Sequence, residues 1–163
     1  MTVTGARHVV IAAVGCEFRR DDGAGPAVLD RLHGELGGAE VLGALASPLD
    51  LLGAWEGAEL AIVIDAIGGD EPGMLHVVEV DLGSSPDACA LPVSRSSSHG
   101  LGVMEALRLA RVLGSGPARV VLVGVAGQDF GEGVGLSPSV SGVVDRAARL
   151  VAELAVTATA GVR

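Results

Sequence analysis

Two aspartates and one histidine are the residues of this sequence whose types and positions best suit a catalytic or metal-binding site. Asp22 follows an apolar segment near the N-terminus, Asp65 comes directly after the apolar residues 60–64, and His99 follows a serine-rich stretch. Two carboxylates and an imidazole are suitable ligands for a divalent transition-metal ion, and they leave coordination positions open for a substrate or a water molecule. The sequence therefore predicts a metal-dependent site built from these three side chains.

Each of the three residues also has a purely structural interpretation. Asp22 precedes a glycine-rich helix start and could serve only as the N-cap of that helix. A lone histidine at a helix start, such as His99, is more often a surface residue than a ligand. Asp65 is harder to explain in this way, because a carboxylate at the end of so apolar a segment is costly unless it is exposed or paired. A functional role is therefore favoured most strongly at Asp65.

The other reactive side chains lack the context of known catalytic motifs. Cys16 neighbours the negative charge of Glu17 and has no histidine close in sequence, so it is interpreted as an inert small residue. The serines of residues 94–98 are not part of a G-x-S-x-G elbow. The chain also has no G-x-G-x-x-G, GK[ST] or H-E-x-x-H motif. Asp22, Asp65 and His99 remain the best candidate site.

The composition predicts one domain that binds neither nucleic acid nor membrane. The 163 residues, 49% of them hydrophobic, suffice for one core, so a single domain over residues 1–163 is expected. The net charge of −9 is spread along the chain and does not suit a nucleic-acid or anionic lipid surface. The longest apolar runs, 60–64 and 120–125, fall far short of the ~20 residues that span a bilayer. With two cysteines outside any CxxC motif and no signal peptide pattern before residue 8, the expected compartment is the cytoplasm.

Apolar segments alternate with helical patterns along the chain. Strands are expected at residues 8–14, 40–45, 60–64 and 119–125, with an edge or antiparallel strand at 74–80. Helices are expected from about Pro26 to Gly37, over 49–55, from His99 to residue 113 with Ser97 or Ser98 as cap, and over 139–155. This order predicts an α/β fold: a three-layer sandwich with a mostly parallel, five-stranded twisted sheet and helices on both faces.

The predicted sheet brings the three candidate residues to one edge. In an open parallel sheet, ligands bind beyond the carboxyl ends of the strands, where the loops converge. Asp22 follows the first strand, Asp65 terminates a central strand, and His99 starts a helix after a long loop. We therefore expect all three side chains to meet at the carboxyl edge of the sheet.

Read together, these segments resemble those of the hydrogenase maturation proteases, the peptidases that remove a C-terminal extension from the large subunit of nickel-iron hydrogenases. The resemblance covers about residues 8–154 and consists of five motifs in the family's order and spacing. They are the first strand with Gly15, Asp21-Asp22-Gly23-Ala24-Gly25, Val63-Ile64-Asp65-Ala66 with the Pro72-Gly73 turn, Ser98-His99-Gly100-Leu101-Gly102, and Val123-Gly124-Val125 with Leu136-Ser137-Pro138. No single motif is specific, but five in the right order are.

The resemblance implies an endopeptidase that acts on the hydrogenase large subunit precursor, and we expect it to be a monomer. It implies that Asp22, Asp65 and His99 are the catalytic and metal-binding residues. It also implies that the nickel is supplied by the substrate, or that another divalent metal takes its place, and that there is no organic cofactor. Three incomplete ligands bind a metal weakly until the substrate completes the set, so cleavage would test whether nickel has been inserted. The ion could polarise the scissile carbonyl or activate a water molecule.

Two positions depart from the family pattern. Cys16 stands where the family commonly has an asparagine, and residues 44–48 replace a frequent Gly-Thr-x-Gly stretch. These differences concern substrate recognition more than the metal ligands. They leave open which hydrogenase subgroup is the substrate.

Two other classes of protein fit part of the pattern. A signalling receiver domain also has an acidic pair after its first strand and an aspartate at the end of a central strand. It needs a lysine to hold its phosphoryl group, however, and this chain has no lysine. A non-catalytic relative that binds a metal or a hydrogenase subunit without cutting it would keep all three ligands. Only a measurement of activity separates that relative from a protease.

Overall fold

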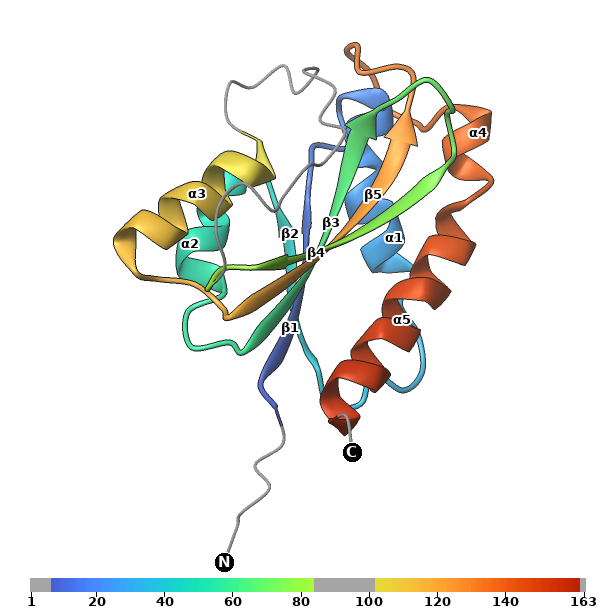
Figure 1. Cartoon of the computed structure of the whole chain (residues 1–163). Coiled ribbons are helices and arrows are strands. Elements are labelled where there is room, and N and C mark those ends of the chain that lie inside the picture. The colour runs from blue at the N-terminus through green and yellow to red at the C-terminus, as the bar shows by residue number, and fades with distance from the viewer. Residues whose placement is uncertain (1–6, 84–101, 162–163) are drawn as a thin grey trace, which may run out of the picture.

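Five strands form one twisted sheet in the computed structural model, which describes residues 7–83 and 102–161 (Figure 1). The strands are β1 (Val9–Val14), β2 (Glu40–Leu45), β3 (Leu60–Gly68), β4 (Leu75–Asp81) and β5 (Arg119–Gly127). Their order across the sheet is β2-β1-β3-β5-β4. All neighbours pair in parallel except β4, which is antiparallel to β5 at one edge. The predicted α/β sandwich with a mostly parallel sheet is confirmed, as is the edge strand.

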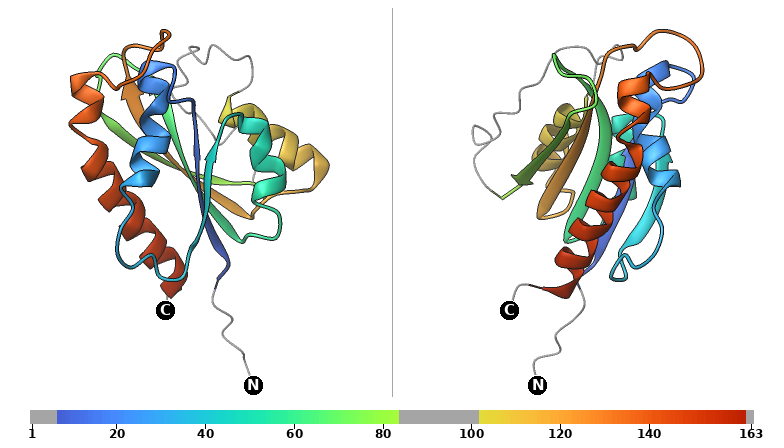
Figure 2. Two further views of the ribbon diagram at one scale, coloured as in Figure 1. Left: turned by 180° about the vertical axis from the view of Figure 1, so that it is seen from behind. Right: turned by 90° about the vertical axis from the view of Figure 1, so that its right-hand side faces the viewer.

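Helices cover both faces of the sheet (Figure 2). One face carries α1 (Ala24–Asp30), α4 (Pro138–Ser141) and α5 (Val144–Ala160), and the other carries α2 (Leu51–Ala54) and α3 (Val103–Leu113). Two single-turn 3-10 helices, η1 (Arg20–Gly23) and η2 (Pro48–Asp50), lead into α1 and α2. Within residues 7–83 and 102–161, no helix is long and apolar enough to cross a membrane.

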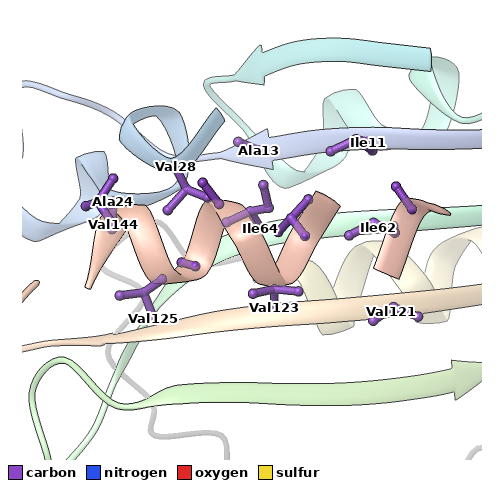
Figure 3. Packing of buried hydrophobic residues seen from close by; sticks show 14 of the residues in the cluster. Ile11, Ala13, Ala24, Val28, Ile62, Ile64, Val121, Val123, Val125 and Val144 are labelled. Carbon is purple, nitrogen blue, oxygen red and sulfur yellow. The ribbon is translucent and has the colours of Figure 1, made fainter. Parts of the chain in front are cut away.

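The sheet is buried on both faces because its central strands are apolar along most of their length. In β1, Val9, Ile11 and Ala13 face the side covered by α1 and α5, whereas the alternate residues face α2 and α3. Figure 3 shows the first of these two layers, in which valines and isoleucines of three strands pack beneath α5. Valine, alanine, leucine and isoleucine side chains build most of the core.

Several helix boundaries differ from the prediction. The helix that begins near Pro26 ends at Asp30 rather than at Gly37, yet Leu32 and Leu36 still pack against the core from an irregular segment. Leu32 and Leu36 have the spacing of a helix face, but they reach the core without being part of a helix. The C-terminal helix is broken at Gly142, which separates α4 from α5.

The α3 helix begins four residues later than the predicted start at His99. Gly102 is its N-cap, and the Glu105 carboxylate accepts the Gly102 N–H at 3.0 Å. A cap at Ser97 or Ser98 is therefore wrong. His99 and both serines lie outside the described residues.

The central strand β3 is longer than predicted, and this changes the setting of Asp65. The strand was expected to end at Asp65, but its pairing with β5 continues from Asp65 opposite Gly124 to Gly68 opposite Gly127. On the other side, pairing with β1 stops at Ala13 opposite Ile64. Asp65 is thus the first residue of β3 that has no pairing partner in β1.

Gly25 provides a test of how closely α1 packs on the sheet. A Cβ at this position would lie 2.7 Å from the Val14 carbonyl oxygen and 3.0 Å from that of Ile64. Because backbone oxygens cannot rotate away, we expect Gly25→Ala to lower the free energy of unfolding by about 1–3 kcal/mol. Urea denaturation of the two proteins measures this difference.

Gly53 serves as the matched control, since it is also helical but has no heavy atom within 4 Å of an added Cβ. Gly53→Ala should leave stability unchanged or raise it by up to about 1 kcal/mol. Equal effects of the two substitutions would contradict the close approach of α1 to the strands.

Candidate active site

The loop after β1 places Asp22 at the carboxyl edge of the sheet. Gly15 has a φ of +145°, and a Cβ there would overlap the carbonyl group of Asp22, so only glycine allows this tight loop. The Asp22 carboxylate accepts the Cys16 N–H through Oδ2 at 2.9 Å. The N-cap of α1 is Gly23, so the interpretation of Asp22 as a helix cap is wrong. Its side chain instead turns back toward the end of β1.

Asp65 lies close enough to Asp22 for their charges to interact. The surrounding protein atoms disfavour a charged carboxyl at Asp65, although the residue keeps some contact with solvent. This burial raises the pKa of Asp65 to about 8; the Asp22 carboxylate adds to the increase, and a hydrogen bond from the Ala66 N–H opposes it. The fold therefore brings two of the three predicted residues together.

A pair of carboxylates in this state suits a cation. Two adjacent negative charges in a poorly solvated place repel each other, and a divalent ion between them would offset both. Among residues 7–83 and 102–161, however, no third His, Cys, Asp or Glu joins them in a group that could hold a metal. His99 lies outside the described residues, so its place beside Asp22 and Asp65 stays a prediction.

Asp21 is a buried anion that sequence reasoning treated only as part of a motif. Its side chain is fully buried, and it accepts hydrogen bonds from the N–H groups of Gln128 (2.9 Å), Asp129 (3.0 Å) and Ser137 (2.7 Å) and from the Ser137 hydroxyl (2.9 Å). Burial by itself raises the pKa of Asp21, but these hydrogen bonds outweigh it and hold the pKa below its ordinary value. The carboxylate thus joins the η1 turn to the loop that follows β5.

The side chains of His8, Cys16 and Cys89 have no assigned role in this site. His8 is at the amino end of β1, where its ring bonds Glu40 at 3.0 Å and the Gly57 carbonyl at 3.2 Å. Cys16 contributes its backbone N–H to the site, and its thiol is free. Cys89 lies outside the described residues.

Comparison with known proteins gives one consistent result. Residues 28–154 match the family model described as hydrogenase maturation protease. The hydrogenase 2 maturation protease of Escherichia coli strain K12 is 25% identical over 145 residues, which cover 86% of this chain and 85% of that protein.

Solved structures of similar proteins agree. The [NiFe] hydrogenase maturation protease HybD from Thermococcus kodakarensis is 27% identical, with a TM-score of 0.66 over 91% of this chain and 99% of that chain. The hydrogenase maturating endopeptidase HybD from Escherichia coli is 24% identical and shares the fold, with a TM-score of 0.70 over 88% of this chain and 89% of that chain.

The pKa of Asp65 predicts how stability depends on pH in the metal-free protein. In the folded state Asp65 holds its proton up to about pH 8, whereas its ordinary value is 3.8. Between these values the folded state binds more protons than the unfolded state, so stability falls as pH rises through this window. Asp65→Asn removes this dependence. We expect the Tm of Asp65→Asn to exceed that of the unaltered protein by an amount that grows by at least about 4 °C between pH 5 and pH 8.

Thermal unfolding in the presence of a chelator, at several values between pH 5 and pH 9, measures this difference. Asp30→Asn makes the same chemical change at an exposed site and is the control. If Asp65→Asn and the unaltered protein lost stability in parallel as the pH rose, Asp65 would not be the buried acid described above.

Proposed function

This chain belongs to the hydrogenase maturation protease family and is a peptidase of hydrogenase maturation, and we propose that it removes the C-terminal extension of a nickel-loaded hydrogenase large subunit precursor. In this proposal, Asp22, Asp65 and His99 bind the nickel of the precursor and direct cleavage. The enzyme acts in the cytoplasm as a monomer and needs no organic cofactor. The family match makes the receiver-domain interpretation wrong.

The observation that carries this proposal is the closeness of Asp22 and Asp65 at the carboxyl edge of the sheet. Asp22 comes from the segment after β1 and Asp65 from strand β3, yet the two carboxyl groups lie near enough for Asp22 to contribute to the raised pKa of Asp65. In a protein without a cation this arrangement is unfavourable, because one charge must be neutralised by a proton. A site that gains from an incoming cation is what recognition of a metal-bearing substrate requires.

The same arrangement explains why loading with nickel would matter. A nickel-loaded precursor presents the positive charge that offsets both carboxylates and releases the proton from Asp65. A nickel-free precursor offers no such charge and would leave the carboxylates unpaired. Held by Asp22, Asp65 and His99, the substrate's ion, or another divalent metal in its place, would supply the charge that polarises the scissile carbonyl or activates a water molecule.

A non-catalytic relative that binds a hydrogenase subunit without cutting it would have the same pair of carboxylates. Only the family's peptidase activity favours cleavage, so a direct assay is decisive.

The purified protein is incubated with its own organism's large subunit precursor, with and without nickel, and intact masses are recorded. We expect loss of a C-terminal peptide from the loaded form alone. No cleavage of either form would support the binding-only relative.

Substitutions at the three residues test the assignment of the site. Asp65→Ala and His99→Ala should lower the rate of processing at least about 100-fold, because several kcal/mol of metal-dependent transition-state stabilisation are lost. Asp22→Asn keeps the hydrogen bond from the Cys16 N–H but loses the charge, so we expect processing about 10-fold slower or worse. Single-turnover assays measure these rates.

The exposed substitution Asp30→Asn is the control and should process the precursor at the normal rate. Circular dichroism establishes that each variant is folded. Normal processing by a folded Asp65→Ala or His99→Ala protein would remove that residue from the mechanism.

A further inference from the structure

The geometry around Asp21 points to a positioning role: we infer that its buried carboxylate holds the η1 turn against the loop after β5 and thereby sets where the neighbouring Asp22 carboxylate lies. This inference rests on the proposed function, in which Asp22 contacts the metal of the substrate. Asp21 itself does not contact the substrate in this account. It acts through Asp22.

Both the side chain and the backbone of Asp21 are hydrogen-bonded to the loop after β5. Its carboxylate accepts four hydrogen bonds from residues 128, 129 and 137, at 2.7–3.0 Å, and its backbone N–H donates to the Asp129 carbonyl at 2.8 Å. A Cβ on Gly127 would lie 2.9 Å from the Asp21 Cβ. Gly127 therefore has no room for a side chain beside Asp21, and both oxygens of the Asp21 carboxylate have hydrogen-bond partners.

The backbone of Arg20, the residue before Asp21, shows that contacts with the loop after β5 determine the shape of the η1 turn. Arg20 has a φ of +51°, in the left-handed region that non-glycine residues rarely adopt. Its N–H donates to the Gly133 carbonyl at 2.9 Å, and its guanidinium donates to the Val134 carbonyl at 3.2 Å. A Cβ on Gly133 would lie within 2.7 Å of that guanidinium. Contacts with the loop after β5 thus maintain a turn that is unfavourable on its own.

The loop after β5 has a defined position relative to Asp65. Strands β3 and β5 pair from Asp65 opposite Gly124 to Gly68 opposite Gly127, and Gln128 follows directly. The hydrogen bonds from this loop to Asp21 therefore fix the position of the η1 turn relative to β3 and β5, the strand pair that carries Asp65. Figure 1 shows the segments after β1 and β5 at the same end of the sheet.

Asp22 inherits this position because it is the next residue in the same turn. Its N–H donates to the Arg19 carbonyl at 3.1 Å, and its carboxylate accepts the Cys16 N–H. The two aspartates thus face opposite ways, Asp21 into the loop after β5 and Asp22 toward the end of β1. If Asp21 were released, the Asp22 carboxylate would shift relative to Asp65 and to the Cys16 N–H.

The Cys16 amide provides a readout that does not depend on activity. In the Asp21→Asn variant, an amide NH₂ replaces one acceptor oxygen and faces donors of Gln128, Asp129 or Ser137. We expect the Cys16 amide proton to shift in a ¹⁵N–¹H NMR spectrum and its hydrogen-exchange protection to fall at least about tenfold. Processing of the nickel-loaded precursor should fall at least about tenfold in kcat.

Asp129→Asn is the matched control, because it makes the same chemical change in the same loop, with a side chain that accepts the Gly131 N–H rather than contacting Asp21. It should leave the Cys16 amide and the processing rate unchanged. Ser137→Ala removes the hydroxyl bond and keeps the other three bonds to the Asp21 carboxylate, so it should shift the Cys16 amide in the same direction by less.

The outcomes separate a positioning role from a structural one. A folded Asp21→Asn protein with a lower Tm, an unchanged Cys16 amide and normal processing would overturn the inference. If Asp21→Asn does not fold, the Ser137→Ala protein decides, and an unchanged Cys16 amide there overturns the inference as well. If the unaltered protein cleaves no precursor, the proposed function fails, while the NMR comparison still decides whether Asp21 positions Asp22.

Discussion

The difference in length between β1 and β3 is the constraint on which the site depends. Pairing between the two strands stops at Ala13 opposite Ile64, whereas β3 continues along β5 to Gly68. Had β1 extended as far, its backbone would cover the flank of Asp65. Instead Gly15 turns the chain away, and the η1 turn brings Asp22 into the space that β1 leaves open. The shorter strand thus creates a place where two acidic groups meet.

Two aspartates at this end of the sheet, Asp21 and Asp65, have opposite electrostatic environments. Asp21 is fully buried, yet its four hydrogen bonds hold the pKa of its carboxyl below the ordinary value. Burial raises the pKa of Asp65 to about 8; the nearby Asp22 carboxylate adds to the increase, and a single backbone N–H bond opposes it. The first arrangement stabilises a permanent anion, which is suited to holding loops together. The second is completed only by a proton or a cation, which is suited to binding a charged substrate.

Close backbone packing around the site limits which residues can occupy several positions. Gly25 lets α1 approach the carbonyl groups of β1 and β3, and Gly127 and Gly133 let the loop after β5 approach Asp21 and Arg20. A side chain at any of these positions would separate the elements that hold the two acidic residues. The glycine-rich character of both loops, visible in the sequence, is thus explained by contacts between them.

The sequence by itself determined the fold class, the location of the strands and the candidate aspartates, because short β-branched runs such as residues 9–14 and 60–64 favour buried strands and a carboxylate following such a run is conspicuous. It did not determine where helices end, since Leu32 and Leu36 reach the core without one. Nor could it show that Asp21, rather than Asp22, is the buried anion. That choice depends on donors more than 100 positions away, at residues 128–137, which only the tertiary structure brings to one aspartate and not to its neighbour.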